Sequence, residues 1–250
     1  MEKVWIRHYQ SGVPAEINPE AYQSLVDLFD QCTQRYAKLK AFTNMGSDIS
    51  FKKLTTVVES FSAFLQQKLG LKKGDRVGIM LPNSLQYPVA MFGVLKAGGT
   101  VVNFNPLYTA DEVAHQIKDS GANIMLVMAN FASVLQEALQ KVTVEHVIVT
   151  ELGDLLSWPK GAIVNVVVNK VKKMIPTWDI PGFIPFKTVI SQGRALKFLP
   201  VEVTNEDIAF FQYTGGTTGV AKGAMLTHRN MVANVEQASA WVKPALGEDQ

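Results

Sequence analysis

A glycine- and threonine-rich stretch is the part of the chain whose residue types are best suited to chemistry. Residues 213–223 read YTGGTTGVAKG and contain four glycines, three threonines and one lysine. Glycines allow backbone N–H groups to approach and surround phosphate oxygens. The threonine hydroxyls add hydrogen-bonding groups that can also reach a magnesium ion, and Lys222 supplies a positive charge. We therefore predict that this stretch is a phosphate-binding loop.

The spacing of its residues distinguishes this loop from two common phosphate-binding motifs. A Walker loop requires Gly-Lys-Ser/Thr, whereas Lys222 lies between Ala221 and Gly223. The dinucleotide fingerprint requires Gly-x-Gly-x-x-Gly, a pattern that the adjacent Gly215 and Gly216 interrupt. A flexible turn without a ligand is the remaining alternative.

Apolar strands and helical segments alternate along the chain. The strands are predicted at residues 76–81, 100–104, 124–128, 146–150 and 208–212. Helical periodicity is predicted within residues 21–40, 54–69, 84–96 and 109–121. This alternation is typical of an α/β fold with a mainly parallel sheet and flanking helices. The glycine-rich stretch would then follow strand 208–212 and precede a helix that begins near Thr227, which favours a ligand site over a bare turn.

Several helix ends carry recognisable signals. Asn83 or Ser84 is expected to cap the third helix, because short polar side chains accept hydrogen bonds from the first turn. Thr109 and Glu112 have the spacing of a capping box, and Gly121 is expected to close the helix that this box begins.

Composition and charge argue against several classes of protein. The net charge of +2 and the lack of a long basic run give no support to nucleic-acid binding. The single cysteine, Cys32, excludes an internal disulfide framework, fits a reducing cytosol and is expected to fill the core. The N-terminus lacks the apolar run of a signal peptide, and no stretch approaches the ~20 apolar residues of a membrane span. We therefore expect a cytoplasmic protein.

Residues 151–205 interrupt the alternation and are expected to be a less regular insertion. Within them, residues 155–178 contain four lysines, no acidic residue and a tryptophan near each end. One interpretation is a surface insertion with a partly buried apolar side. The other is a basic amphipathic patch that contacts the inner face of an anionic membrane.

The histidines do not indicate a metal site. His8, His115 and His146 are scattered without metal-ligand spacing. His228 lies close to the glycine-rich stretch, at the start of the last predicted helix. Its neutral imidazole could donate a hydrogen bond to a ligand or pack against the helix end, and both interpretations stay open.

The glycine-rich stretch resembles the nucleotide signature of the adenylate-forming superfamily, which includes acyl- and aryl-CoA synthetases, luciferases and peptide-synthetase adenylation domains. GDRVGIMLPNSLQYPVAMFGVLKAGGTVVNFNPLYT, at residues 74–109, resembles the N-terminal core of that superfamily. ISFKKL, at residues 49–54, resembles the segment that opens its fold. The resemblance extends over nearly the whole chain and is weakest at 151–205.

Departures from the common signature point to one branch of the superfamily. Gly215 stands where many members carry serine, and Ala221 where many carry proline. Together with AMLTHRN at 224–230 and NPLYT to HQIKDSGA at 105–122, they resemble the bacterial long-chain fatty-acyl-CoA synthetases.

The resemblance implies a two-step reaction. A fatty carboxylate attacks the α-phosphate of ATP bound with Mg²⁺, which yields an acyl-adenylate and pyrophosphate. The thiolate of coenzyme A then displaces AMP. The implied partners are therefore fatty acid, ATP and coenzyme A, and the resemblance is also compatible with a homodimer of the complete protein.

Site residues can be assigned by matching positions in the signature. Thr214 is the candidate for magnesium contact and Lys222 for phosphate contact, whereas Tyr213 is expected to anchor the strand end. The residues assigned to nucleotide binding are Tyr213, Thr214, Gly215, Gly216, Thr217, Thr218, Gly219, Lys222 and Gly223.

Other parts implied by the resemblance do not occur in this sequence. The acidic magnesium ligand, the adenine- and ribose-binding segment and the small C-terminal domain with its catalytic lysine are expected beyond Gln250. Residues 1–250 are therefore interpreted as a partial AMP-binding domain that is inactive alone. Two alternatives stay open: a ligase for a short, aromatic or amino acid, and a non-catalytic nucleotide- or membrane-binding module.

Overall fold

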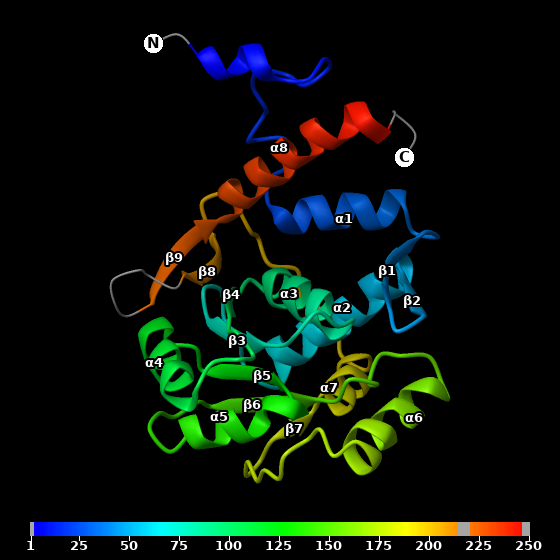
Figure 1. The fold of residues 1–250 in the computed structure, drawn as a ribbon, viewed down its shortest axis with the longest axis vertical. Helices are drawn as coiled ribbons and strands as arrows, with labels where there is room; N and C mark the ends of the chain where they lie inside the picture. Colours follow the sequence, from blue (N-terminus) through cyan, green and yellow to red (C-terminus); the bar gives the residue numbers. More distant parts are fainter. Residues whose placement is uncertain (1–2, 215–220, 247–250) are drawn as a thin grey trace.

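A seven-stranded sheet forms the centre of the computed structural model, which describes residues 3–214 and 221–246 (Figure 1). The strand order is β7-β6-β5-β3-β4-β8-β9, and all neighbours are parallel except β8 and β9. The strands are β3 (Arg76–Met80), β4 (Thr100–Asn103), β5 (Ile124–Met128), β6 (His146–Thr150), β7 (Ile184–Pro185), β8 (Ile208–Thr214) and β9 (Lys222–Thr227). A separate antiparallel pair comprises β1 (Lys40–Asn44) and β2 (Ser47–Ser50).

Helices cover both faces of the sheet, as a mainly parallel sheet requires. One apolar cluster joins the sheet to α1 (Leu25–Arg35), α2 (Phe51–Gln67), α3 (Gln86–Lys96) and α7 (Phe186–Gly193). The other joins it to α4 (Ala110–Ser120) and α5 (Ala132–Ala138). The remaining helical elements are η1 (Val4–His8), η2 (Ala129–Phe131), α6 (Lys160–Val166), the π-helical η3 (Val167–Val171) and α8 (His228–Leu246). The predicted α/β fold is confirmed.

The helix ends agree with the sequence signals at α4 and disagree at α3. Thr109 and Glu112 form the complete capping box, and Gly121 takes the left-handed conformation at the C-terminus of α4. The prediction that Asn83 or Ser84 caps α3 was wrong, because Leu85 occupies the N-cap position and no side chain caps the helix. Among the described residues, no helix is both long and apolar enough to cross a bilayer.

The segment 151–205 is more regular than its sequence suggests. Its second half supplies β7, which pairs with β6 at the sheet edge, and α7, which packs against α2. Phe186 and Val189 of α7 are buried, and Gly193 lies so close to the Ser60 carbonyl oxygen that a Cβ atom there would be 1.9 Å from it. In its first half, Leu152, Leu155 and Leu156 also pack against the core, whereas α6 lies at the periphery of the molecule (Figure 1).

His228 joins the start of α8 to the start of α1. The side chain is 1% exposed, and its Nδ1 atom accepts a hydrogen bond of 3.2 Å from the backbone N–H of Leu25. Burial lowers the pKa of His228 to about 4, so the imidazole is neutral at physiological pH. The structure therefore supports helix-end packing over contact with a ligand.

We predict that His228 makes stability fall as the pH falls from 7 to 5. Its folded-state pKa of about 4 lies below its ordinary value of 6.5, so within this window the unfolded chain binds a proton that the folded chain rejects. The stabilisation is present above pH 6.5, and about 2 kcal/mol of it is lost by pH 5. Denaturant unfolding of the protein and of His228→Asn, whose amide oxygen can accept the same N–H, should differ in pH dependence by this amount. Equal pH dependence of the two proteins would contradict the prediction.

Candidate functional site

The glycine-rich stretch connects two antiparallel strands. The helix predicted to begin near Thr227 is present, since α8 begins at His228. Between the stretch and this helix lies a strand that was not predicted, β9, formed by residues 222–227. β9 pairs with β8 and satisfies the backbone groups that would otherwise be an open sheet edge. Six strand residues span ~20 Å. The N-terminus of α8 is thus too far from the turn to contribute its dipole to a phosphate there.

The base of this hairpin places two of the predicted ligands opposite each other. Thr214 ends β8, Lys222 begins β9, and the two residues are partners in the strand register. Directly opposite residues in an antiparallel pair project from the same face, with Cβ atoms ~5 Å apart. Both residues are exposed. A hydroxyl and an ammonium group therefore flank the entrance to the loop on one side of the sheet.

The neighbouring pair, Tyr213 and Gly223, faces the opposite side of the hairpin. The Tyr213 ring is buried against the α4 side of the sheet, and its hydroxyl donates a 2.5 Å hydrogen bond to Asp119 of α4. Burial, assisted by Asp119, raises the pKa of Tyr213. A Cβ atom on Gly223 would lie 2.9 Å from Cζ of Tyr213, so glycine leaves the space that the ring requires. Tyr213 thus attaches the end of β8 to α4, and its assignment to nucleotide binding stays a prediction.

A row of polar side chains connects the strand ends beside this hairpin. Tyr87 at the start of α3 donates to Oδ1 of Asn103 at the end of β4, at 3.1 Å. The Asn103 amide donates in turn to Oε1 of Gln212 in β8, at 3.2 Å. The helices that follow β3 and β4 lie on opposite faces of the sheet, which makes the carboxyl ends of these strands a topological switch point. Such crevices are where open α/β sheets bind their ligands.

Sequence reasoning missed Tyr87, Asn103 and Gln212. The signal available was the polar residue that ends each apolar run, in TVVN and FFQYT. Nothing in the sequence shows that these two runs become adjacent strands.

Five of the residues predicted to bind the nucleotide cannot be placed. Gly215, Gly216, Thr217, Thr218 and Gly219 lie outside the described residues. Within the described ranges, no three His, Cys, Asp or Glu side chains cluster as a site built from protein ligands alone would require.

The lone thiol shows no sign of activation. Cys32 of α1 is half-buried, and burial raises its pKa. A raised pKa disfavours the nucleophilic thiolate. Cys32 is nevertheless only partly buried and belongs to neither apolar cluster, so the prediction that it fills the core is not confirmed.

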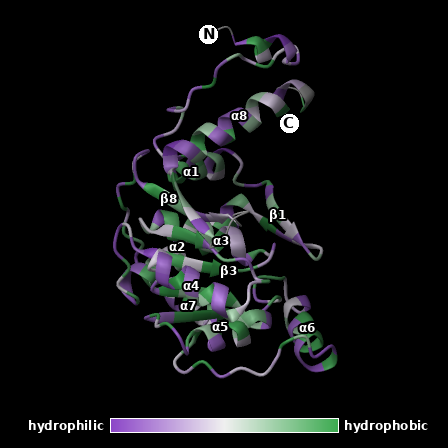
Figure 2. Cartoon of the chain, turned by 60° about the vertical axis from the view of Figure 1, so that its left-hand side comes forward, coloured by the Kyte–Doolittle hydropathy of each residue, from purple (hydrophilic) through white to green (hydrophobic). Residues whose placement is uncertain are grey.

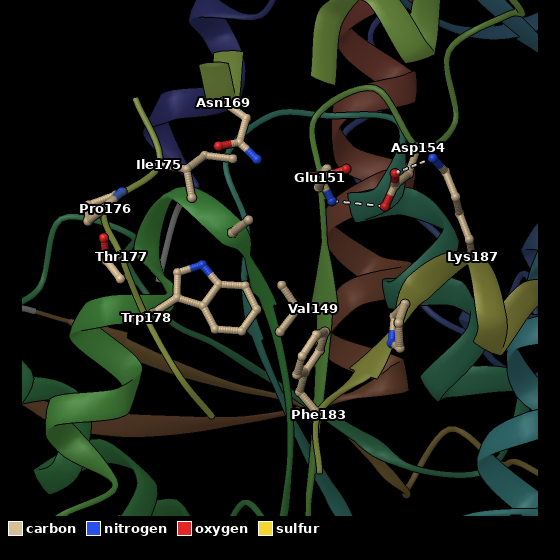
Figure 3. Close-up of a pocket in the computed structure, with 12 residues that line it drawn as sticks. Val149, Glu151, Asp154, Asn169, Ile175, Pro176, Thr177, Trp178, Phe183 and Lys187 are labelled. Carbon is tan, nitrogen blue, oxygen red and sulfur yellow. Dashed lines mark hydrogen bonds and ion pairs between the residues drawn. The ribbon is translucent and has the colours of Figure 1, made fainter. Parts of the chain in front are cut away.

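A cavity of about 450 Å³ lies at the other edge of the sheet, beside β6 and β7 (Figure 3). Trp178 and Phe183 form its apolar side and pack edge to face, with ring centroids 5.0 Å apart. Its polar side includes Asp154, which forms a 3.1 Å ion pair with Lys187. Because β5, β3 and β4 separate this cavity from β8, it is not part of the hairpin site.

A family profile and individual protein sequences match this chain and point to the same kind of protein. The profile of a family described as AMP-binding enzyme matches residues 29–250. A long-chain-fatty-acid–CoA ligase of Salmonella typhimurium is 54% identical over 246 residues, covering 98% of this chain and 44% of that protein. A ligase of the same name from Bacillus subtilis is 34% identical over 245 residues, which are 96% of this chain and 43% of that protein. The chain thus spans less than half the length of these relatives.

Solved structures share the fold at low sequence identity. An anthranilate CoA ligase in complex with anthranoyl-AMP superposes with a TM-score of 0.67 at 20% identity, over 83% of this chain and 35% of that one. A fatty acyl-adenylate ligase from L. pneumophila, in complex with acyl adenylate and pyrophosphate, has a TM-score of 0.59 at 23% identity, over 88% and 33% of the two chains.

We predict that the Tyr213–Asp119 hydrogen bond stabilises the hairpin by about 1.5–3 kcal/mol, since its acceptor is a carboxylate. Tyr213→Phe and Asp119→Asn should each lower the free energy of unfolding. The double variant should lose less than the sum of the two single losses, because both substitutions remove the same bond. Strictly additive losses in urea unfolding would show that the bond contributes nothing.

Proposed function

Because this chain belongs to the AMP-binding enzyme family, we propose that it is the N-terminal part of an ATP-dependent long-chain fatty acid–CoA ligase. Two observations support the substrate class. The relatives named long-chain-fatty-acid–CoA ligase reach 54% identity, and the match covers 98% of this chain. The proposed activity belongs to the complete gene product, of which these residues would form the first part.

The proposed reaction has two steps. The carboxylate oxygen of the fatty acid attacks the α-phosphorus of ATP, forming the acyl–phosphate bond of an acyl-adenylate as pyrophosphate leaves. The sulfur of coenzyme A then attacks the acyl carbon, forming the thioester as AMP leaves. Both steps move negative charge onto phosphate oxygens, so positioned donors and cations are what a protein can contribute.

The β8–β9 hairpin is the observation that carries the proposal. Thr214 and Lys222 flank the loop from paired positions, exposed on one face. Lys222 is proposed to neutralise the β- or γ-phosphate, and Thr214 to donate its hydroxyl to the same group. Tyr213 and Asp119 are positioning residues, since they fix the strand from which Thr214 projects.

The row of polar side chains formed by Tyr87, Asn103 and Gln212 supports the same location for the nucleotide. The row ends at Gln212, two residues before Thr214. The crevice and the start of the loop therefore both lie at the carboxyl ends of the strands. Residues 215–219, which lie outside the described ranges, are proposed to bind the pyrophosphate end of ATP through their backbone N–H groups.

The remaining partners are proposals that depend on the reaction. Coenzyme A follows from the name of the relatives. Magnesium, for which Thr214 is the candidate contact, stays a prediction. A cytoplasmic location, contact with the inner face of a membrane and a homodimer of the complete protein likewise stay predictions.

Replacing Lys222 tests the phosphate role. In the complete gene product, Lys222→Ala should reduce kcat/KM for ATP in pyrophosphate exchange by about 100-fold, the usual effect of losing one group that stabilises developing charge. Lys222 is exposed, so the melting temperature should not change. Lys52→Ala, which removes an exposed lysine of α2, is the matched control and should exchange normally. An unchanged rate in Lys222→Ala would exclude this role.

A panel of acids tests the substrate class. Exchange of labelled pyrophosphate into ATP should depend on added palmitate and should not occur with acetate or benzoate. Exchange with acetate or benzoate but not with palmitate would show that the enzyme forms an adenylate with a different class of acid. No exchange with any of the three acids would favour the non-catalytic alternative.

A further inference from the structure

We propose that the cavity beside β6 and β7 binds a small ligand that carries a quaternary ammonium group. The cavity has a volume of about 450 Å³ and lies where strands end, since Ala129 follows β5 and Glu151 follows β6 (Figure 3). The strands of the sheet are largely hydrophobic (Figure 2), so the charges that line the cavity come from residues outside the strands. Loops at the carboxyl ends of strands are where α/β folds commonly bind ligands.

Two aromatic side chains form a corner in the wall of this cavity. The rings of Trp178 and Phe183 lie at 81° to each other, with centroids 5.0 Å apart. The face of an aromatic ring carries partial negative charge and attracts organic cations, among which quaternary ammonium groups are recognised in this way. Val149 and Ile175 add to the apolar lining, so the methyl groups of such a ligand would contact carbon atoms.

One carboxylate of the cavity has no cation of its own. The Asp154 side chain is 5% exposed and pairs with Lys187 at 3.1 Å, so these two charges cancel. None of the ion pairs found within residues 3–214 and 221–246 includes Glu151. Burial and the neighbouring Asp154 charge raise the pKa of Glu151, because both disfavour its ionised form. A monovalent organic cation would supply the missing positive charge.

Hydrogen bonds hold Glu151 in place. The Asn165 amide donates to Oε2 of Glu151 at 2.9 Å and to Oδ1 of Asp154 at 3.2 Å, which ties the two carboxylates together. Asn165 and Gly161 are the buried residues of α6, so this helix turns a polar side chain inward. The backbone N–H of Glu151 donates to Asp154 at 2.8 Å, and its carbonyl oxygen accepts from the Gln86 amide at 2.8 Å. The carboxylate is thus preorganised, which lowers the entropic cost of binding.

The aromatic wall of the cavity is attached at both of its ends. The Asn130 amide donates a 3.1 Å hydrogen bond to the carbonyl oxygen of Met174. The backbone N–H of Asp179 donates a 2.6 Å hydrogen bond to Oε1 of Gln136. These two bonds enclose residues 175–178 and attach them to η2 and α5. The cavity therefore lies between two walls that are anchored to different parts of the fold.

A quaternary ammonium ion fits these groups better than other charged ligands do. Glu151 would repel an anion. The described side chains include no cluster of three His, Cys, Asp or Glu that would hold a divalent metal ion by protein ligands alone. A primary ammonium group brings three donors that need acceptors, whereas both oxygens of Asp154 already accept hydrogen bonds within the protein. A quaternary group has no donor to satisfy and packs directly against aromatic rings.

Calorimetric titration of the complete gene product with choline tests the proposal. No ATP or fatty acid is added, so the result does not depend on the proposed ligase activity. The neutral control is the tert-butyl analogue of choline, in which a carbon atom replaces the nitrogen. Choline should bind about 10-fold more tightly than this alcohol, because only the cation interacts with the ring faces and the carboxylate. It should also bind more tightly than ethanolamine, which has a primary ammonium group.

Two variants assign the binding to this cavity. Glu151→Gln retains an oxygen that can accept from Asn165 but removes the charge, and it should weaken choline binding about 10-fold without changing the affinity for the neutral alcohol. Trp178→Leu retains an apolar wall and should weaken choline binding by a similar factor. Glu145→Gln removes an exposed carboxylate just before β6, at the other end of the strand, and is the matched control that should bind choline normally.

The proposal is overturned if choline does not bind at millimolar concentration, or if its neutral analogue or ethanolamine binds equally well. It is also overturned if choline binding survives both Glu151→Gln and Trp178→Leu. The two substitutions lie on separately anchored walls of the cavity, so a folding defect in one variant leaves the other as a test.

Discussion

The pairing of β8 with β4 decides where the glycine-rich loop lies. The two strands are distant in the chain, yet Val101 pairs with Phe210 and Val102 with Phe211. The Thr100 hydroxyl adds a 2.9 Å hydrogen bond to the carbonyl oxygen of Ile208. A central strand buried on both faces must have both of its edges paired, since unpaired backbone groups are costly away from water. This requirement brings the end of β8 beside the end of β4, and the loop follows.

The hairpin site and the α6 segment lie beyond opposite edges of the same sheet. β8 and β9 form one edge, while β6 and β7 form the other and lead into the segment with α6. Both sites follow the carboxyl ends of strands, where α/β folds leave their backbone turns free for function. The sheet between them is a packed core with few polar groups.

Buried polar groups act at both edges as positioning devices. At one edge, Tyr213 uses its hydroxyl to attach β8 to α4, and His228 uses its neutral imidazole to attach α8 to α1. At the other edge, Asn165 attaches α6 with its apolar face outward. These contacts contribute modest free energy each, but they select one arrangement among several that apolar packing alone would allow.

The sequence by itself determined the alternation of strands and helices, the capping box of α4, the glycine-rich loop and the family to which the loop belongs. These follow from local rules, because periodicity, caps and turn residues act within a few positions of one another. Three features were decided only by tertiary structure: β9 between the loop and α8, the Tyr87–Asn103–Gln212 row, and the outward face of α6. The first two depend on which strands become neighbours, and the third depends on close contact between Gly153 and Gly161. Such long-range contacts cannot be read from local spacing.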